Sequence, residues 1–159
     1  MLGFENLTGS AFNDTLTGST AANTLSGLAG NDTLSGGAGA DRLIGGLGKD
    51  TLTGGTESDT FVFDNVTDSA VGTNRDLVTD FAIGIDKIDL SGIGDEVTGP
   101  EDHMTFIGTT AFSGVAGELR QFASGSQTIL KGDVNGDGIA DFQIAFTSTL
   151  VFSSSDFIL

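Results

Sequence analysis

Apolar and polar positions recur with a fixed period of nine along residues 9–62. Read in nines, this segment gives six near-copies: GSAFNDTLT, GSTAANTLS, GLAGNDTLS, GGAGADRLI, GGLGKDTLT and GGTESDTFV. A glycine opens each copy, an Asp or Asn takes the sixth place, and a Leu or Phe takes the eighth. Because a fixed short period is the sign of a repeat architecture, the pattern predicts a stack of coils.

Each copy is predicted to be a six-residue turn followed by a three-residue strand. In the triplet Thr33-Leu34-Ser35, the middle side chain points inward and its neighbours face water. Two copies make one coil, so residues 18 apart lie above one another at about 4.8 Å, the ordinary strand spacing. The sequence therefore predicts an all-β, right-handed parallel β-roll, a β-solenoid with two inner ladders of apolar side chains. These ladders are Leu16, Leu34 and Leu52, and Leu7, Leu25, Leu43 and Phe61.

After Val62 the period stops, and short apolar runs separated by turn residues take its place. We interpret these runs as strands of a β-sandwich-like C-terminal cap. The predicted domains are therefore a roll at 1–62 and a cap at 63–159, and residues 118–122 form either a short helical turn or an edge strand. The strands are expected at residues 61–63, 77–81, 88–90, 105–107, 128–130, 142–146 and 150–152.

The net charge of −16, from 22 acidic against 6 basic residues, narrows the choice of partners. Such a surface repels nucleic acid and anionic lipid and attracts multivalent cations. A polyanionic glycan is a poor ligand for this charge unless calcium bridges the two. The chain has no Cys, so a disulfide cannot cross-link the fold, but a metal ion can. The sequence shows no apolar run long enough to span a membrane and no cleavable N-terminal signal.

Stacking the coils also stacks the residues at the sixth place. Asp14, Asp32 and Asp50 fall on one edge, while Asn23, Asp41 and Asp59 fall on the other. Two carboxylates about 5 Å apart repel by roughly 1 kcal/mol in water. Calcium takes six to eight oxygen ligands, including carboxylates and the carbonyls that glycine-rich turns leave free. The pattern therefore predicts several Ca²⁺ ions; the alternative is an acid that only hydrogen-bonds the turn backbone.

The repeats resemble those of the RTX family, whose nonapeptide GGxGxDxUx binds Ca²⁺ in a parallel β-roll. The best matches are GGAGADRLI from Gly36 and GGLGKDTLT from Gly45. Further on, DTFVF, DLVTDF, DKIDLS, DVNGDGIADF and the final DFIL are similar to the C-terminal domain of serralysin-type secreted metalloproteases. Similar roll modules end secreted lipases and polyuronate epimerases.

The resemblance implies which residues bind the ions. In each turn, the acid at the sixth place and carbonyls at about the first to fourth places are ligands. Asp68, nine residues after Asp59, is expected to close the last site, and Asp86 or Asp89 to contribute. Sites near Asp14 and Asn23 are expected to be weak or missing, since Phe12 and Ala21 break the pattern. The transferred ligands are Gly27, Ala29, Gly30, Asp32, Gly36, Gly37, Ala38, Gly39, Asp41, Gly45, Gly46, Leu47, Gly48, Asp50, Gly54, Thr56 and Asp59.

The resemblance further implies a secreted, extracellular module that folds when it binds Ca²⁺. Residues 156–159 would belong to an uncleaved signal read by a type I secretion apparatus, and any catalytic domain would lie elsewhere in the parent protein. The alternative function is a calcium-stabilised module that binds a polysaccharide or ice through outward Thr and Ser rows, among them Thr15, Thr33 and Thr51.

Catalytic motifs are missing, so we do not expect an enzyme. There is no HExxH, no G-x-S-x-G and no Cys, and the single histidine, His103, is expected at the surface. The loop from Asp133 begins with the D-x-N-x-D-G spacing of an EF-hand, but its twelfth position is Ile144 instead of Glu. A shorter calcium loop and a plain Asx/Gly turn both remain open there.

Overall fold

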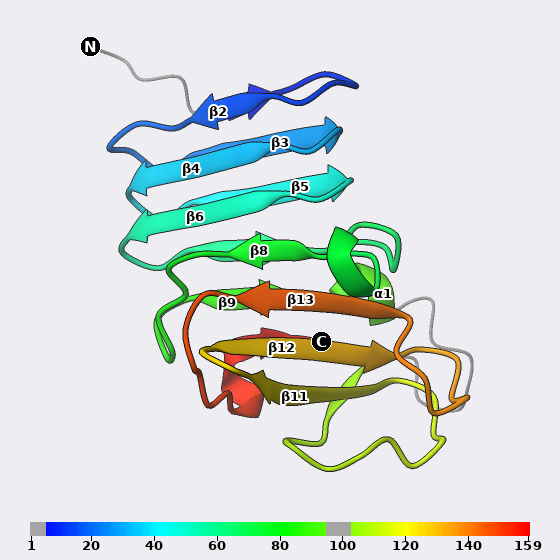
Figure 1. The fold of residues 1–159 in the computed structure, drawn as a ribbon. Helices are drawn as coiled ribbons and strands as arrows, with labels where there is room; N and C mark the ends of the chain where they lie inside the picture. Colours follow the sequence, from blue (N-terminus) through cyan, green and yellow to red (C-terminus); the bar gives the residue numbers. More distant parts are fainter. Residues whose placement is uncertain (1–5, 95–102) are drawn as a thin grey trace.

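The computed structural model describes residues 6–94 and 103–159. Within these ranges the strands form a six-stranded sheet and an eight-stranded sheet, and the first half of the chain passes from one to the other with every turn. All strand pairs of the repeat region are parallel (Figure 1). The six-stranded sheet takes β1 (Asn6–Thr8), β3 (Thr24–Ala29), β5 (Arg42–Leu47) and β7 (Thr60–Val62), and the eight-stranded sheet takes β2 (Thr15–Thr17), β4 (Thr33–Ala38) and β6 (Thr51–Thr56).

The register confirms the predicted two-copy coil. Leu16 pairs with Leu34 and Leu34 with Leu52, while the other ladder runs from Leu7 to Phe61. The predicted strand length was wrong for β3 to β6, which each have six residues. The residues that follow each triplet continue the strand pairing, as Gly37 opposite Gly55 shows. Half of each expected six-residue turn is therefore strand.

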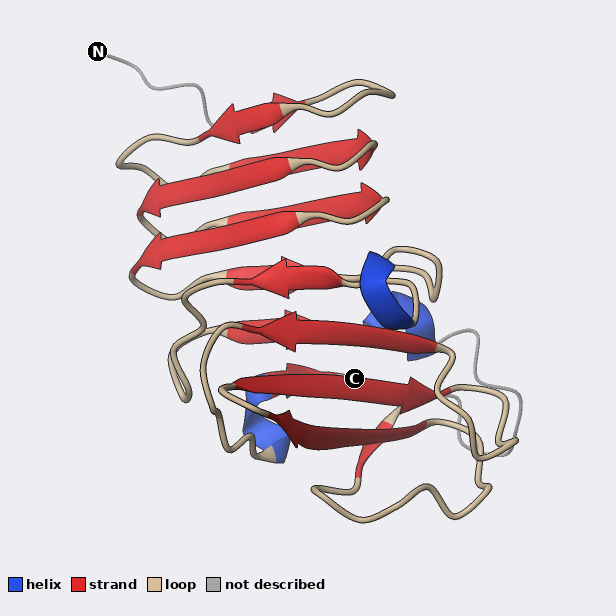
Figure 2. Cartoon of the chain, viewed as in Figure 1, coloured by secondary structure: helices blue, strands red, loops and turns tan. Residues whose placement is uncertain are grey.

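The C-terminal half prolongs both sheets (Figure 2). A separate sandwich-like cap is therefore not confirmed, and the boundary at residue 63 stays a prediction. A short helix, α1 (Ser91–Gly94), and two 3₁₀ turns, Gly72–Asn74 and Ser154–Asp156, lie between strands. The added strands are β9 (Lys87–Asp89) and β14 (Phe157–Ile158) in the six-stranded sheet, and β8 (Asp76–Val78), β13 (Phe142–Phe146), β12 (Gln127–Asp133), β11 (Glu118–Ser124) and β10 (Thr105–Phe106) in the eight-stranded sheet.

Three strand predictions in this half need correction. Residues 150–152 are not a strand, because side chains take their backbone donors: Leu150 N–H donates to Thr128 Oγ1 and Phe152 N–H to Gln121 Oε1, both at 2.8 Å. The segment 118–122 is a strand, as one of the two alternatives had it, but it is not an edge strand, since β11 lies between β10 and β12. The strand expected at 77–81 ends at Val78.

The core lies between the two sheets and runs the length of the stack. Leucines fill it in the roll, and phenylalanines fill it in the C-terminal half. Phe81 contacts Phe61, Phe146 and Phe152, with ring centroids 5.3–6.0 Å apart. The inner ladders and the aromatic cluster are thus one continuous core, on which the turns at both edges are fixed.

In the part of the chain that the structure describes, every helix is too short and too polar to cross a membrane.

Candidate calcium sites

Two ladders of acidic side chains run along the two edges of the stack. In each ladder, the backbone N–H of one member donates to Oδ1 of the member in the next coil, at 2.7–3.0 Å. One carboxylate oxygen is therefore committed to holding the coils in register. We call the set Asp14, Asp32, Asp50 and Asp76 the first ladder, and the set Asn23, Asp41, Asp59 and Asp86 the second ladder.

The members of each ladder differ in whether the second side-chain oxygen has a hydrogen-bond partner. Five acids have a buried Oδ2 without a hydrogen-bond partner: Asp32, Asp41, Asp50, Asp59 and Asp76. Burying an anionic oxygen without a partner costs free energy, so these oxygens favour a bound cation. At the start of the roll, by contrast, Ser10 N–H donates to Asp14 Oδ2 and Ser19 N–H to Asn23 Oδ1, both at 2.6 Å. This contrast supports the prediction of weak first sites, which remains a prediction.

Four of the five orphaned oxygens, those of Asp32, Asp41, Asp50 and Asp59, lie against the glycine that opens their own repeat. A Cβ on Gly27 would clash with Asp32 Oδ2 and lie 2.6 Å from the carbonyl oxygen of Gly45 in the next coil. A Cβ on Gly36 would likewise clash with Asp41 Oδ2 and lie 2.6 Å from the Gly54 carbonyl oxygen. A carboxylate oxygen and a carbonyl oxygen from successive coils therefore converge on one point, which is the donor set that Ca²⁺ prefers.

Side chains alone do not make a cage. Among the described residues, no three acidic or histidine side chains gather closely enough to hold an ion by themselves. Calcium at these edges therefore requires turn carbonyls as well. The predicted carbonyl donors lie in the second half of β3 to β6 and in the turns that follow; they are Gly27, Ala29, Gly30, Gly36, Gly37, Ala38, Gly39, Gly45, Gly46, Leu47, Gly48, Gly54 and Thr56. Their role as ligands remains a prediction.

In the four copies from Gly27 onward, the second and fourth places of the repeat adopt positive φ. Gly37 and Gly39 have φ of 109° and 101°, and the glycines of the next copies behave alike. This conformation is cheap for glycine and strained for other residues, yet Leu28 (φ 76°) and Glu57 (φ 85°) adopt it. The glycine-rich composition thus serves the backbone shape of the turn as well as the close approach of the acid.

Asp68 lies in a turn of its own, and its role in closing the last site remains a prediction. Asp68 is buried, but its Oδ2 accepts from the N–H groups of Asp64 and Asn65, both at 2.9 Å, within its own turn. Asp76 takes the next place in the first ladder instead, since it accepts from Asp50 N–H at 2.7 Å. Sequence reasoning missed Asp76 because residues 64–75 break the period. The signal was present, since Asp76-Leu77-Val78 repeats the acid-x-apolar order of Asp50-Thr51-Leu52.

Burial and neighbouring acids make both ladders electrostatically unfavourable without a cation. Desolvation by burial raises the pKa of Asp50 and Asp59 to about 6 and that of Asp76 to about 9, although a backbone hydrogen bond lowers each. The charge of Asp68 further raises the pKa of Asp50 and Asp76, which places Asp68 near the first ladder. Burial also raises the pKa of Asp41 and Asp86. A divalent cation would remove this penalty.

The other sequence candidates are less suited to binding. Asp133 accepts from the N–H groups of Gly136 and Gly138, both at 2.8 Å, and Asp141 accepts from Val134 N–H at 2.7 Å. These contacts favour the Asx/Gly turn between β12 and β13 over a calcium loop. His103 is exposed, as expected.

The fold and the two ladders define the class: a parallel β-roll module of the calcium-binding repeat type. The chain belongs to the Peptidase M10 serralysin C-terminal family, whose profile matches residues 7–159. The resemblance to calcium-binding RTX modules is therefore confirmed.

Solved structures agree with this assignment. The chain is similar to the AlgE6R2 subunit of the Azotobacter vinelandii mannuronan C5-epimerase, with 32% identity, a TM-score of 0.69, and 96% of this chain and 91% of that chain covered. The AlgE6R3 subunit of the same enzyme gives 30% identity and a TM-score of 0.68, with 94% and 80% covered. A search of curated proteins finds no match. The parallel β-roll prediction is thus confirmed, and modules of this family are found in secreted proteins.

Proposed function

We propose that this chain is a non-catalytic calcium-binding module that folds outside the cell and supports type I secretion and folding of a larger secreted enzyme. The observation that carries the proposal is the row of buried, unpartnered Oδ2 atoms in both ladders. Bound Ca²⁺ would supply the positive charge that these oxygens lack. Asp32, Asp41, Asp50 and Asp59, with carbonyls of the adjoining turns, are the residues that would hold it.

The same ladders give the module a switch between two environments. In the cytosol, where free calcium is scarce, the buried acids oppose folding and leave the chain loose enough for export. Extracellular modules commonly bind calcium with dissociation constants of about 10⁻⁴–10⁻³ M. At millimolar calcium each filled site then contributes on the order of 1 kcal/mol, and several sites together drive folding.

The folded position of the C-terminus fits export before folding. Asp156 is fully buried, and its carboxylate accepts from Gly84 N–H at 2.9 Å and Ser153 N–H at 2.7 Å. Phe157 is also buried, and Leu159 packs against the core. Because residues 156–159 are tied into the fold, we propose that the secretion apparatus reads them while the chain is still unfolded.

Far-UV circular dichroism and isothermal titration calorimetry test the calcium-dependent folding. We expect a weak β signal in EDTA, a full β signal in millimolar Ca²⁺, and little change with Mg²⁺ at the same concentration. Asp32→Asn should raise the calcium midpoint several-fold, whereas its matched control Asp14→Asn, from the same ladder, should change it little. A complete β spectrum in EDTA that calcium leaves unchanged would overturn the proposal.

Export is tested separately. A reporter fused to residues 1–159 should be secreted by cells that carry a type I apparatus, and removal of residues 156–159 should abolish its export. Equal export of both fusions would contradict the assignment of the signal.

The alternative, a polysaccharide- or ice-binding module, also relies on calcium for the fold. Thr15, Thr33 and Thr51 are in register on the eight-stranded sheet, but Leu77 takes the next place. The row therefore ends after three coils. Thermal hysteresis of the folded protein would reveal ice binding.

A further inference from the structure

Three successive copies of the repeat carry a large apolar side chain where their sister copies carry a small or polar residue. Leu28 takes the second place of its copy, which is glycine in the three copies that follow. Ile44 takes the ninth place, which is Ser or Thr in the copies before and after. Leu47 takes the third place, which is Ala in the two copies before it. All three departures from the repeat are therefore toward a larger apolar group.

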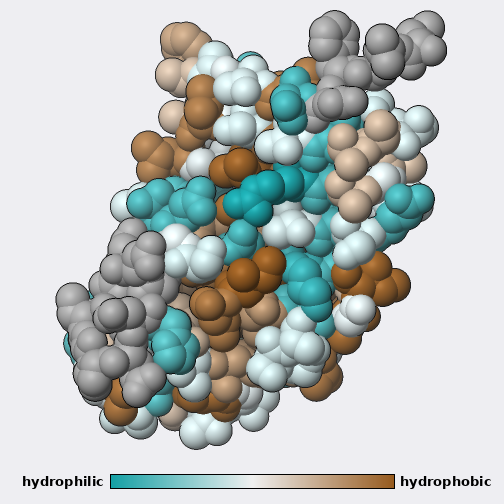
Figure 3. Space-filling view, turned by 180° about the vertical axis from the view of Figure 1, so that it is seen from behind, coloured by the Kyte–Doolittle hydropathy of each residue, from teal (hydrophilic) through white to brown (hydrophobic). Residues whose placement is uncertain are grey.

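The fold brings these three side chains to one place. All three lie on the paired strands β3 and β5, and they line a hollow of about 400 Å³. Residues of the turn at 64–68 also line it. Figure 3 shows the molecule from the side of the six-stranded sheet, to which β3 and β5 belong, and hydrophobic patches there border a band of hydrophilic residues. We call the hollow lined by Leu28, Ile44 and Leu47 the apolar hollow.

The apolar side chains of this hollow cost free energy that the core does not recover. Leu28 has a φ of 76°, a conformation that strains any residue other than glycine. Its side chain is 50% exposed and that of Leu47 is 51% exposed, and neither belongs to the core between the sheets. Strain and exposed apolar surface both lower stability, so their meeting at one hollow favours a binding role over a packing role.

The two edges of the roll differ in the same sense. Leu28 and Leu47 lie in turns of the first-ladder edge, and Phe12, in the turn of the coil before them, is also exposed. The matching turns of the second-ladder edge hold only small or polar residues at the second and third places, which are Ser19, Thr20, Gly37, Ala38, Gly55 and Thr56. A requirement of the turn itself would act on both edges alike, so this difference also favours a binding role.

The rim of the apolar hollow is acidic. Asp64 is exposed there, and the buried Asp68 also lines the hollow. Asn65 and Thr67 add polar groups, and none of the described residues that line the hollow is a Lys or Arg. The hollow therefore offers apolar contact beside a negative charge.

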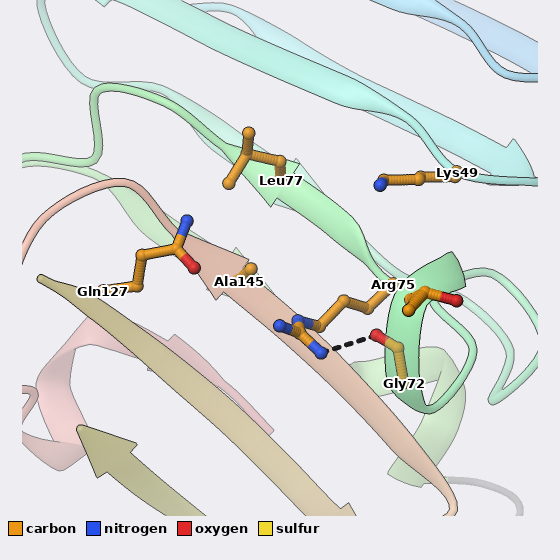
Figure 4. Close-up of a pocket in the computed structure, with 7 residues that line it drawn as sticks. Lys49, Gly72, Arg75, Leu77, Gln127 and Ala145 are labelled. Atoms are coloured by element: carbon orange, nitrogen blue, oxygen red, sulfur yellow. Dashed lines mark hydrogen bonds between the residues drawn. The ribbon is translucent and has the colours of Figure 1, made fainter. Parts of the chain in front are cut away.

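The basic residues closest along the chain are directed elsewhere. Arg42, two residues before Ile44 on β5, donates to Asp89 at 3.0 Å. Lys49 lines a separate hollow of about 240 Å³ on the eight-stranded sheet, together with Arg75 (Figure 4). Neither base therefore neutralises the acidic rim.

We propose that the apolar hollow docks an amphipathic segment of another polypeptide, one that presents a large aliphatic side chain beside a Lys or Arg. Leu28, Ile44 and Leu47 would contact the aliphatic side chain, and Asp64 would face the base. In protein interfaces a few buried anchors inside a polar rim carry most of the affinity, so a short segment is sufficient. Docking would also cover the exposed leucines.

Charge and area argue against two other occupants. A fatty acid or an anionic lipid would bring its negative group to a rim that is already acidic, and like charges placed together oppose binding. A second copy of this chain would bring a net charge of −16 against another −16. Three apolar side chains are also far fewer than the roughly 20 to 30 residues that each side of a stable interface contributes.

Calorimetry on the folded protein in 5 mM Ca²⁺ tests the proposal with model peptides. An amphipathic peptide of twelve residues made of Leu and Lys should bind, with an affinity that falls as salt is raised. A peptide with Ser in place of Leu keeps the charge and should bind at least 10-fold more weakly, and one with Glu in place of Lys should give no heat of binding. Equal binding of either control peptide would overturn the proposal. Because calcium is present throughout, the outcome does not depend on whether calcium drives folding or export.

Variants that restore the residue of a sister copy locate the site. Leu28→Gly, Ile44→Ser and Leu47→Ala should each weaken binding of the Leu/Lys peptide about 3-fold, and the triple variant should weaken it at least 10-fold. Val151→Ala, at an exposed apolar residue outside the hollow, should change the affinity less than 1.5-fold. None of these changes alters the charge, so full affinity in the triple variant would mean a general charge effect and would refute the site.

The acidic rim is tested by matched acid variants. Because an exposed ion pair changes an equilibrium only several-fold, Asp64→Asn should weaken binding of the Leu/Lys peptide about 3-fold. Asp137→Asn removes the same charge from an exposed acid in the turn after β12 and should change the affinity less than 1.5-fold. Equal losses in both variants would contradict the assignment of the rim.

Leu28→Gly also separates a binding role from a structural one. Glycine adopts the positive φ without strain, so the variant should not lower the midpoint of denaturant unfolding in calcium, although it weakens peptide binding. A lower midpoint with unchanged affinity would mean that Leu28 serves the fold, and it refutes the proposal. A wild-type dimer in sedimentation that the triple variant abolishes would assign the hollow to a second copy, and it refutes the proposal as well.

Discussion

Asp76→Asn should strengthen the calcium-free fold and weaken calcium binding at the same time. Asp76 is fully buried, its Oδ1 accepts from Asp50 N–H, and its Oδ2 has no partner. Burial raises its pKa from 3.8 to about 9. In EDTA at pH 7.5 the folded state therefore holds a proton that the unfolded state lacks. Since one pKa unit corresponds to 1.36 kcal/mol, this difference opposes folding by at most roughly 5 kcal/mol.

Asparagine is neutral and can still accept from Asp50 N–H. The variant should therefore gain up to this amount of stability in EDTA, but it loses a charged calcium ligand. We would measure the fraction of folded protein by far-UV circular dichroism, in EDTA, where the wild type is expected to be mostly unfolded, and at graded calcium concentrations. Asp14→Asn is the control, because Ser10 satisfies the Asp14 oxygen. The reasoning is refuted if Asp76→Asn is less stable than wild type in EDTA, or if it keeps the wild-type calcium midpoint.

Three further predictions concern the same edges. The pKa values of Asp50 and Asp59 in the fold, about 6, lie above 3.8, so the penalty that these two carboxyls impose on the calcium-free fold should be absent below pH 4 and should grow as the pH rises through 6. Circular dichroism in EDTA at pH 4, 5 and 7 checks this sign, and calcium should reverse the trend because its ligands must be ionised. Glu57→Gly should raise the stability by about 1 kcal/mol because glycine adopts this positive φ without strain. Glu57→Ala keeps the strain and should give no gain. Denaturant unfolding in calcium measures both variants. Gly36→Ala should lower the stability of the calcium-bound fold by more than about 2 kcal/mol because its Cβ would meet Asp41 Oδ2. Gly125→Ala, with open space around its Cβ, should lower the stability by only about 1 kcal/mol. An equal loss of stability in both variants would contradict the crowding argument.

The repeat half was predictable because local and global requirements coincide there. One nine-residue pattern sets the inward Leu34, the turn glycines and the edge Asp32, and the register follows from the period. The strand length was not predictable from the pattern, since a glycine pair reads as a turn. In the structure, Gly37 and Gly55 are paired across neighbouring coils despite their positive φ.

The C-terminal half was less predictable because its strands pair over long sequence distances. The apolar run near Phe142 correctly marks β13, but nothing local shows that β13 lies beside β8, whose paired residues come 68 positions earlier. The run at Leu150–Phe152 looked like a strand, yet Thr128 and Gln121 side chains bind its backbone. The place of Asp76 in the first ladder was missed for the same reason, because it follows from the pairing of β8 with β6.

The junction between the two halves explains how buried acids are held together against their repulsion. Within the roll, successive ladder members are 18 residues apart, but Asp76 follows Asp50 by 26 and Asp86 follows Asp59 by 27. The ladders survive this loss of period because Asp76 begins β8 and Asp86 directly precedes β9, and each strand has a fully buried apolar residue, Val78 or Ile88. Those strands pair with the roll on one side and the C-terminal strands on the other. Apolar burial in the C-terminal half therefore fixes the last acids next to the roll. The electrostatic penalty collects at this junction, where calcium would relieve the most.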